Sequence, residues 1–169
     1  MLVIGIDPGY ARIGYSIIQF KKNQFQIINC GLIETLPKNE PTERLSSIHR
    51  QLQDILGNFT VDTAAVEQIF YAKNHKTAMM VAQARGVILL SLALFHIPVF
   101  EYTPLQVKQA ILGYGRADKL QIKKTLELIF NHKISKVTDD VTDSMAVAIC
   151  HLNSLKMKNL IQKHIIAHD

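Results

Sequence analysis

The run Val3-Ile4-Gly5-Ile6 is apolar throughout and ends at the turn sequence Asp7-Pro8-Gly9. Successive side chains of a strand point to opposite faces of a sheet, so a strand that is apolar on both faces must be covered on both. We therefore expect this run to be a central strand of a sheet that has helices packed against it.

Further strands are expected directly after this one, at 12–20 and 25–33, with the polar turn Lys21-Lys22-Asn23-Gln24 between them. Tight turns join strands that run antiparallel, so the first three strands are expected to form a meander. Apolar runs at 61–67 and 97–102 predict two more short strands.

The rest of the chain has the spacing of helices. Apolar residues recur every three or four positions from 45 to 56, and Gly57-Asn58 ends that helix. The sequence Thr103-Pro104-Leu105-Gln106 is typical of a helix start, with Thr as the cap, Pro at the first helical position and Gln at the third. Asp118 is expected to cap the next helix. The expected helices cover 45–56, 74–95, 104–113, 118–131 and 138 to beyond 152. The order is β-β-β-α-β-α-β-α-α-α, which predicts an α/β domain with a mixed sheet.

The 169 residues, 48% of them hydrophobic, suit one domain with a core of its own. Cys30 and Cys150 fit no metal-ligand spacing, so two buried thiols in a reducing cytoplasm are expected. An acid and a Pro-Gly turn precede any long apolar run, which argues against a signal peptide. The most hydrophobic stretch, 87–95, is too short to span a bilayer and favours a buried helix. Composition thus excludes a secreted mini-protein, a membrane protein and a multidomain enzyme.

Four acidic residues stand in unusual places. Asp7 and Glu67 each close an apolar strand, and ligands bind at strand ends in α/β sheets. Asp140 and Asp143 are spaced i, i+3 at the start of an otherwise apolar helix, so they share one face. Taken singly, each has a structural explanation as a turn, an edge or a cap residue. Together they form the oxygen-rich ligand set that Mg²⁺ or Mn²⁺ needs.

The sequence argues against zinc and against a phosphate-binding loop. The histidines are scattered, there is no cysteine cluster, and no Gly-rich loop with Lys-Ser/Thr occurs. The net charge of +5 suggests a polyanionic partner. On a basic protein, two metal ions held by carboxylates can bridge a phosphodiester and activate a water for hydrolysis.

Six segments, in order, closely resemble the RuvC family of bacterial Holliday-junction resolvases in the RNase H-like superfamily. They read Gly5-Ile6-Asp7-Pro8-Gly9, Glu67-Gln68-Ile69-Phe70-Tyr71-Ala72-Lys73-Asn74, Gln83-Ala84-Arg85-Gly86, Gln106-Val107-Lys108-Gln109-Ala110, Gly113-Tyr114-Gly115-Arg116-Ala117-Asp118-Lys119-Leu120-Gln121 and Asp140-Val141-Thr142-Asp143-Ser144-Met145-Ala146. One departure is Ile13-Gly14-Tyr15-Ser16, where the family usually has Thr-Gly-aromatic-Gly. The resemblance covers residues 1–155 as a single nuclease domain, and 156–169 is expected to be a frayed basic tail.

The resemblance implies an RNase H-like fold, an α/β fold with a five-stranded mixed sheet whose first three strands are antiparallel. It places the catalytic and metal-binding acids at Asp7, Glu67, Asp140 and Asp143, with two Mg²⁺ ions per site and Mn²⁺ as a substitute. The family spacing selects Asp140 over the adjacent Asp139, for which a capping role is expected.

The resemblance also implies an activity: paired symmetric nicks in a four-way DNA junction, which leave 5′-phosphate and 3′-hydroxyl ends, in recombination and repair. It implies a homodimer, branch-migration partners of the RuvA and RuvB type, and a cytoplasmic location. The family's basic residues near the site fall on Lys108 and Lys119, and its base-stacking aromatic falls on Phe70. The helix expected at 74–95 is apolar nearly all round, so it is either central to the core or covered by a second subunit.

Three other functions are consistent with part of the sequence. A related RNase H-like nuclease of the ribosomal-RNA-processing type shares the Asp-x-Gly start but is not expected to carry the Lys108 and Lys119 segments. A sugar kinase or actin-like ATPase needs two domains. A junction-binding protein without activity gains nothing from buried acids near phosphates.

The excess positive charge is local. Residues 104–136 hold seven Lys and Arg residues and two acids, and the rest of the chain is neutral. This segment is therefore expected to lie on the DNA-binding face, with Arg116 and Lys123 among its contacts.

Overall fold

The computed structural model describes residues 1–69, 75–115, 118–134 and 137–166. Its elements are β1 (Leu2–Asp7), β2 (Arg12–Lys21), β3 (Gln24–Glu34), α1 (Pro41–Gly57), β4 (Thr63–Glu67), α2 (His75–Leu94), β5 (Val99–Tyr102), α3 (Pro104–Leu112), α4 (Lys119–Phe130) and α5 (Asp139–Ile166). This is the order of strands and helices that the sequence predicts.

The five strands form one mixed sheet in the order β3-β2-β1-β4-β5. β1 pairs antiparallel with β2, and β2 pairs antiparallel with β3, so the expected meander is confirmed. β4 runs parallel to β1, and β5 runs parallel to β4. The doubly apolar run at the N-terminus is therefore the central strand, as expected.

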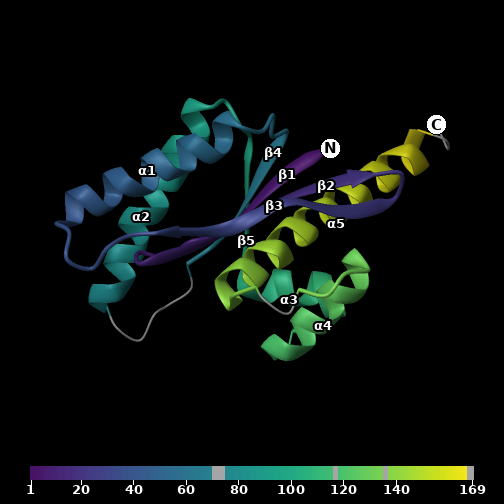
Figure 1. Ribbon diagram of the computed structural model, residues 1–169. Helices are drawn as coiled ribbons and strands as arrows, with labels where there is room; N and C mark the ends of the chain where they lie inside the picture. The colour runs from purple at the N-terminus through teal and green to yellow at the C-terminus, as the bar shows by residue number, and fades with distance from the viewer. Residues whose placement is uncertain (70–74, 116–117, 135–136, 167–169) are drawn as a thin grey trace.

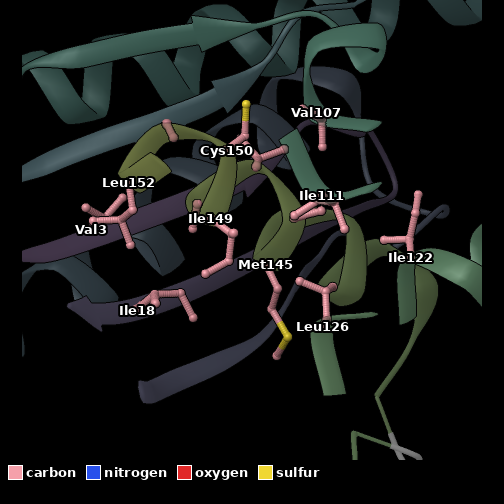
Figure 2. Close-up of a cluster of buried hydrophobic side chains, with 14 of the residues drawn as sticks. Val3, Ile18, Val107, Ile111, Ile122, Leu126, Met145, Ile149, Cys150 and Leu152 are labelled. Carbon is pink, nitrogen blue, oxygen red and sulfur yellow. The ribbon is translucent and has the colours of Figure 1, made fainter. Parts of the chain in front are cut away.

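Helices cover both faces of the sheet, with α1 and α2 on one side and α3, α4 and α5 on the other (Figure 1). Ile4 and Ile6 of β1 pack toward α1 and α2, whereas Val3 packs toward α5. Figure 2 shows this second core, in which Met145 and Ile149 of α5 lie among side chains from α3, α4 and the sheet. The alternation along β1 thus divides the interior into two cores.

Local signals fix the ends of several helices. Thr103 and Asp118 cap α3 and α4 and exchange hydrogen bonds with the third helical residue, which confirms both predicted starts. α1 begins at Pro41, earlier than its apolar spacing suggests, because the backbone N–H of Glu40 donates to Glu43 at 3.3 Å. A proline at the first helical position favours the same start.

The last helix is longer than the sequence suggests. Residues 156–166 continue α5 to Ile166, and Lys156 Nζ donates a hydrogen bond to Asn23 Oδ1 at 3.0 Å. Cys30 and Cys150 are free thiols; Cys150 is buried and Cys30 is half-buried. Burial raises the pKa of the Cys150 thiol to about 11, which makes it an unreactive core residue.

Helix α2 is less buried than the sequence suggests. The 18-residue window Thr77–Leu94 has a mean hydropathy of 1.6, long and apolar enough to cross a membrane by length and composition, and 22% of it is buried. Ala84, Ile88 and Leu92 face the core, whereas Met79, Leu90 and Leu94 are more than half exposed. The expected buried helix is thus buried on one side only: α1 and the sheet cover that side (Figure 1), whereas the described part of the chain leaves the other side exposed.

Candidate active site

Asp7 and Glu67 are neighbours on the same face of the sheet. β1 and β4 are parallel, with Ile6 opposite Val66, so the next residue of each strand stands at the same carboxyl end. Ile6 and Val66 pack toward α1 and α2. Because side chains alternate along a strand, Asp7 and Glu67 point to the other face, where α5 lies.

The start of α5 lies directly against β1 and β2. A Cβ atom on Gly14 would overlap the carbonyl oxygen of Asp140, and one on Gly5 would overlap that of Ser144. Gly14 is also the residue of β2 that pairs with Asp7. Two glycines thus let the helix approach the strands closely enough to bring its first acids to the side of Asp7.

Burial and neighbouring negative charge raise the pKa values of three of these acids. Burial raises the pKa of Asp7 to about 8, with further increases from the charges of Glu67, Asp143 and Asp140. Burial also raises the pKa values of Glu67 and Asp143. Acids from two strands and one helix therefore form a single electrostatic cluster, in which the negative charges are unfavourable unless a cation offsets them.

Two predicted lysines adjoin this cluster. The charges of Lys108 on α3 and Lys119 on α4 act on Glu67 and oppose the increase in its pKa. Lys119 Nζ lies 3.4 Å from Asp143 Oδ2 and 3.2 Å from Asp139 Oδ2. Burial lowers the pKa of Lys119, but the two aspartates outweigh burial and raise it. The side of the cluster next to α3 and α4 is therefore positively charged.

The structure distinguishes the two adjacent aspartates at the start of α5. Asp139 is the first helical residue rather than the cap residue before the helix, and its side chain is 68% exposed. The side chain of Asp140 is 27% exposed, and its charge acts on Asp7. The expected capping role of Asp139 therefore does not match its position, whereas Asp140 lies with the other three acids.

Arg12 is a residue near the site that the sequence did not single out. Its Nε lies 3.3 Å from Asp140 Oδ2. As the first residue of the strand that follows the Asp7-Pro8-Gly9 turn, Arg12 could have been placed near this end of β1, although not against Asp140.

Two predicted DNA contacts, Phe70 and Arg116, lie outside the described residues. Lys123 follows Lys119 by one turn of α4 and is half-buried. Its side chain therefore lies on the same side of α4 as that of Lys119.

The acid cluster suits a divalent metal ion by its chemistry. Within the described ranges, no three His, Cys, Asp or Glu side chains are already arranged to hold a metal ion. Asp140 is turned to Arg12, and Asp143 is turned to Lys119. Both carboxylates are partly exposed and held by single cations, so they are free to exchange these partners. Four carboxylates that lie close together form the hard, anionic oxygen set that suits a divalent metal ion.

Known proteins resemble the chain over nearly its whole length. The family model described as "Crossover junction endodeoxyribonuclease RuvC" matches residues 3–151. Proteins of that name from Petrotoga mobilis and Alkaliphilus oremlandii are each 46% identical, over 90% and 91% of this chain and 94% of each relative.

Among solved structures, "T. thermophilus RuvC in complex with Holliday junction substrate" superposes with a TM-score of 0.88 at 29% identity, over 94% of this chain and 96% of the other. The strand order and the flanking helices match this RNase H-like fold. The family consists of metal-dependent nucleases, in agreement with the acid cluster. The chain therefore belongs to the RuvC family of crossover junction endodeoxyribonucleases, enzymes that hydrolyse phosphodiester bonds of DNA.

Proposed function

We propose that the chain resolves four-way DNA junctions by paired symmetric nicks, with Asp7, Glu67, Asp140 and Asp143 as its catalytic metal-binding residues. The observation that carries this proposal is the cluster of partly buried acids from two strand ends and one helix start, where burial raises the pKa of Asp7 to about 8. The matching T. thermophilus structure contains a Holliday junction, which supports this DNA form as the substrate. Such an activity belongs to homologous recombination and DNA repair.

The proposed metal is Mg²⁺, two ions per site, with Mn²⁺ as a substitute, since the ligands are all carboxylate oxygens. Asp7 is the expected central ligand because its carboxylate interacts with those of the other three acids. Bound ions would lower the pKa of the attacking water and stabilise charge on the leaving oxygen. The expected products, as the family resemblance implies, carry 5′-phosphate and 3′-hydroxyl ends.

The basic residues of α3 and α4 have a separate role in this proposal. Lys108 and Lys119 face the acids and would hold the phosphate backbone of the cleaved strand at the cluster. Lys123 would extend this contact along α4, and Arg116 would extend it along the segment before α4. Phe70 would stack on an unpaired base of the junction. Positive charge beside the acids offsets their repulsion of DNA.

A cleavage assay tests the proposed substrate. The protein is incubated with Mg²⁺ and a labelled four-way junction, a linear duplex of the same sequence or an RNA–DNA hybrid. Paired nicks at symmetric positions of the junction, with little cutting of the duplex, are expected. Equal cutting of all three substrates, or preferred cutting of the hybrid, would contradict junction resolution.

The exposed side of α2 supports a homodimer. Met79, Gln83, Gly86 and Leu90 follow one another at three- and four-residue steps and are all exposed. A Cβ atom on Gly86 would meet nothing within 4 Å, so another helix can approach closely there. We infer that two copies pack through this side of α2. A twofold dimer would present two active sites to two strands of like polarity, as symmetric nicking requires.

Leu90→Glu tests this interface. A charge placed in a buried apolar interface is expected to weaken self-association by about 100-fold or more. Leu36→Glu is a matched control, since Leu36 and Leu90 are both 57% exposed and Leu36 lies outside α2. Sedimentation velocity at micromolar concentration should show a dimer for the unaltered chain and for Leu36→Glu, and a monomer for Leu90→Glu. A dimer in all three would exclude this side of α2 as the interface.

The proposed activity implies a setting and partners. Branch-migration proteins of the RuvA and RuvB type are the proposed partners, as the resemblance to the RuvC family implies. The proposed location is the bacterial cytoplasm, where the DNA lies.

A further inference from the structure

Arg12 lies beside the acid cluster on the side opposite the lysines. Ile13 and Ile17 of β2 pack toward α1 and α2, so alternation turns Arg12 and Gly14 to the face that α5 covers. In the sheet, β2 and β4 flank β1 on opposite sides. Arg12 therefore adjoins Asp140 from the β2 side of the cluster, whereas the charges of Lys108 and Lys119 act on Glu67, on the β4 side.

The backbone that carries Arg12 is held firmly. The carbonyl oxygen of Ala11 accepts a hydrogen bond from the backbone N–H of Thr35 at 3.0 Å. A Cβ atom on Gly9 would overlap the carbonyl oxygen of Arg12, so the turn before β2 is tightly packed. The Arg12 side chain is nevertheless 58% exposed. A rigid backbone with an exposed cationic side chain is an arrangement suited to binding.

The ion pair between Arg12 and Asp140 is weak enough to exchange. The contact joins Nε to one carboxylate oxygen at 3.3 Å, and Arg12 makes no other ion pair within the described part of the chain. Ion pairs between partly exposed side chains contribute little to stability. A phosphate diester offers the guanidinium two oxygens, which arginine binds through two parallel hydrogen bonds.

We propose that Arg12 is a substrate-binding residue that holds a phosphate of the cleaved DNA strand next to the scissile one. Its pairing with Asp140 is the resting contact, and the DNA phosphate replaces this contact. Cations then lie on both sides of the acid cluster, so that the strand crosses the carboxylates between two anchored phosphates. This proposal rests on the proposed function and adds to it a contact on the β2 side of the site.

Junction affinity in the absence of metal tests this proposal without any cleavage. The binding of a fluorescent four-way junction is measured in EDTA over a series of KCl concentrations. Arg12→Gln is expected to weaken binding by about tenfold and to reduce the slope of log K against log salt by about one, as for the loss of one phosphate contact. Arg50→Gln is the matched control, because Arg50 is an exposed arginine of α1, the helix that packs against the opposite face of the sheet. Arg12→Lys should retain the slope and recover only part of the affinity, because lysine lacks the planar fork.

A double-mutant cycle separates a direct contact from a general charge effect. Asp140→Asn removes the resting partner of Arg12, so it should tighten junction binding more when Arg12 is present than in the Arg12→Gln background. Equal effects of Asp140→Asn in both backgrounds, or equal affinities of Arg12→Gln and Arg50→Gln, would overturn the proposal. If the unaltered chain binds the junction no better than linear duplex, the proposed function falls as well. If it prefers the junction and Arg12→Gln behaves as Arg50→Gln, only the role of Arg12 falls.

Discussion

Replacing Asp7 by Asn is expected to slow junction cleavage by about 10³-fold or more while junction affinity stays the same or increases. Asparagine has nearly the same shape but brings only a neutral oxygen to the site, so it cannot replace the central carboxylate ligand. The same substitution should not weaken DNA binding, because it removes an acid that lies beside the expected path of a polyanion. Single-turnover cleavage with Mg²⁺ and gel shift in EDTA measure the two effects separately.

Two further aspartates provide controls for this result. Asp54→Asn makes the same change at an exposed position of α1 and should leave cleavage unchanged. Asp140→Asn should resemble Asp7→Asn, whereas Asp139→Asn should have a much smaller effect, since Asp139 is mostly exposed. Full cleavage by Asp7→Asn would refute the metal-ligand assignment, and a larger loss for Asp139→Asn than for Asp140→Asn would move that assignment by one residue.

The second large expected effect concerns His151, a fully buried residue that joins α5 to β4 and β5. Its ring nitrogens lie 3.0 Å from Thr63 Oγ1 and 2.8 Å from the Tyr102 hydroxyl. Burial, together with the charge of Lys158, lowers the pKa of His151 to about 4 from 6.5. His151 therefore stays neutral in the folded protein at pH values where the unfolded chain binds a proton.

This difference predicts the direction of a pH effect. Above pH 6.5 neither state carries the proton, and the full stability is present. As pH falls from 6.5 to 4, His151 becomes protonated in the unfolded chain but stays neutral in the folded chain. The difference between the two pKa values corresponds to a decrease of about 3 kcal/mol in the free energy of unfolding.

Urea denaturation at pH 7 and pH 4 measures this loss for the unaltered chain and for His151→Gln. The acid cluster titrates in both proteins, so its contribution cancels in the difference between them. The difference in free energy of unfolding should shrink by about 3 kcal/mol at the lower pH. His132→Gln, at an exposed histidine, should show no such change. A constant difference between pH 7 and pH 4 would show that burial does not hold His151 neutral.

Much of the fold could be predicted because its signals are local. The apolar run before Asp7, the cap at Thr103 and the cap at Asp118 each act within a few residues, and the structure has strands or helices there. The start of α1 was predicted too late, since apolar spacing marks only the residues of a helix that face the core. The four acids could also be singled out, because each interrupts or closes an apolar segment.

Other features depend on contacts between distant segments. The sequence gives no sign that Arg12 faces Asp140, because the two are 128 positions apart and meet only when α5 lies across β2. The sequence also did not indicate which side of α2 would be exposed. The helix is apolar on all sides, so its exposed side is set only when α1 and the sheet cover the other side.

By itself, the sequence determined the elements, their order and the residue types that can hold a metal ion, since hydrophobic periodicity, capping and carboxylate chemistry act at short range. The tertiary structure decided that Asp7, Glu67 and Asp143 come together in partly buried positions where their pKa values rise, that Asp140 lies beside them, and which cations adjoin them. The reason is that register and helix docking set these contacts: Ile6 opposite Val66 places Asp7 beside Glu67, and Gly14 lets the start of α5 reach β2.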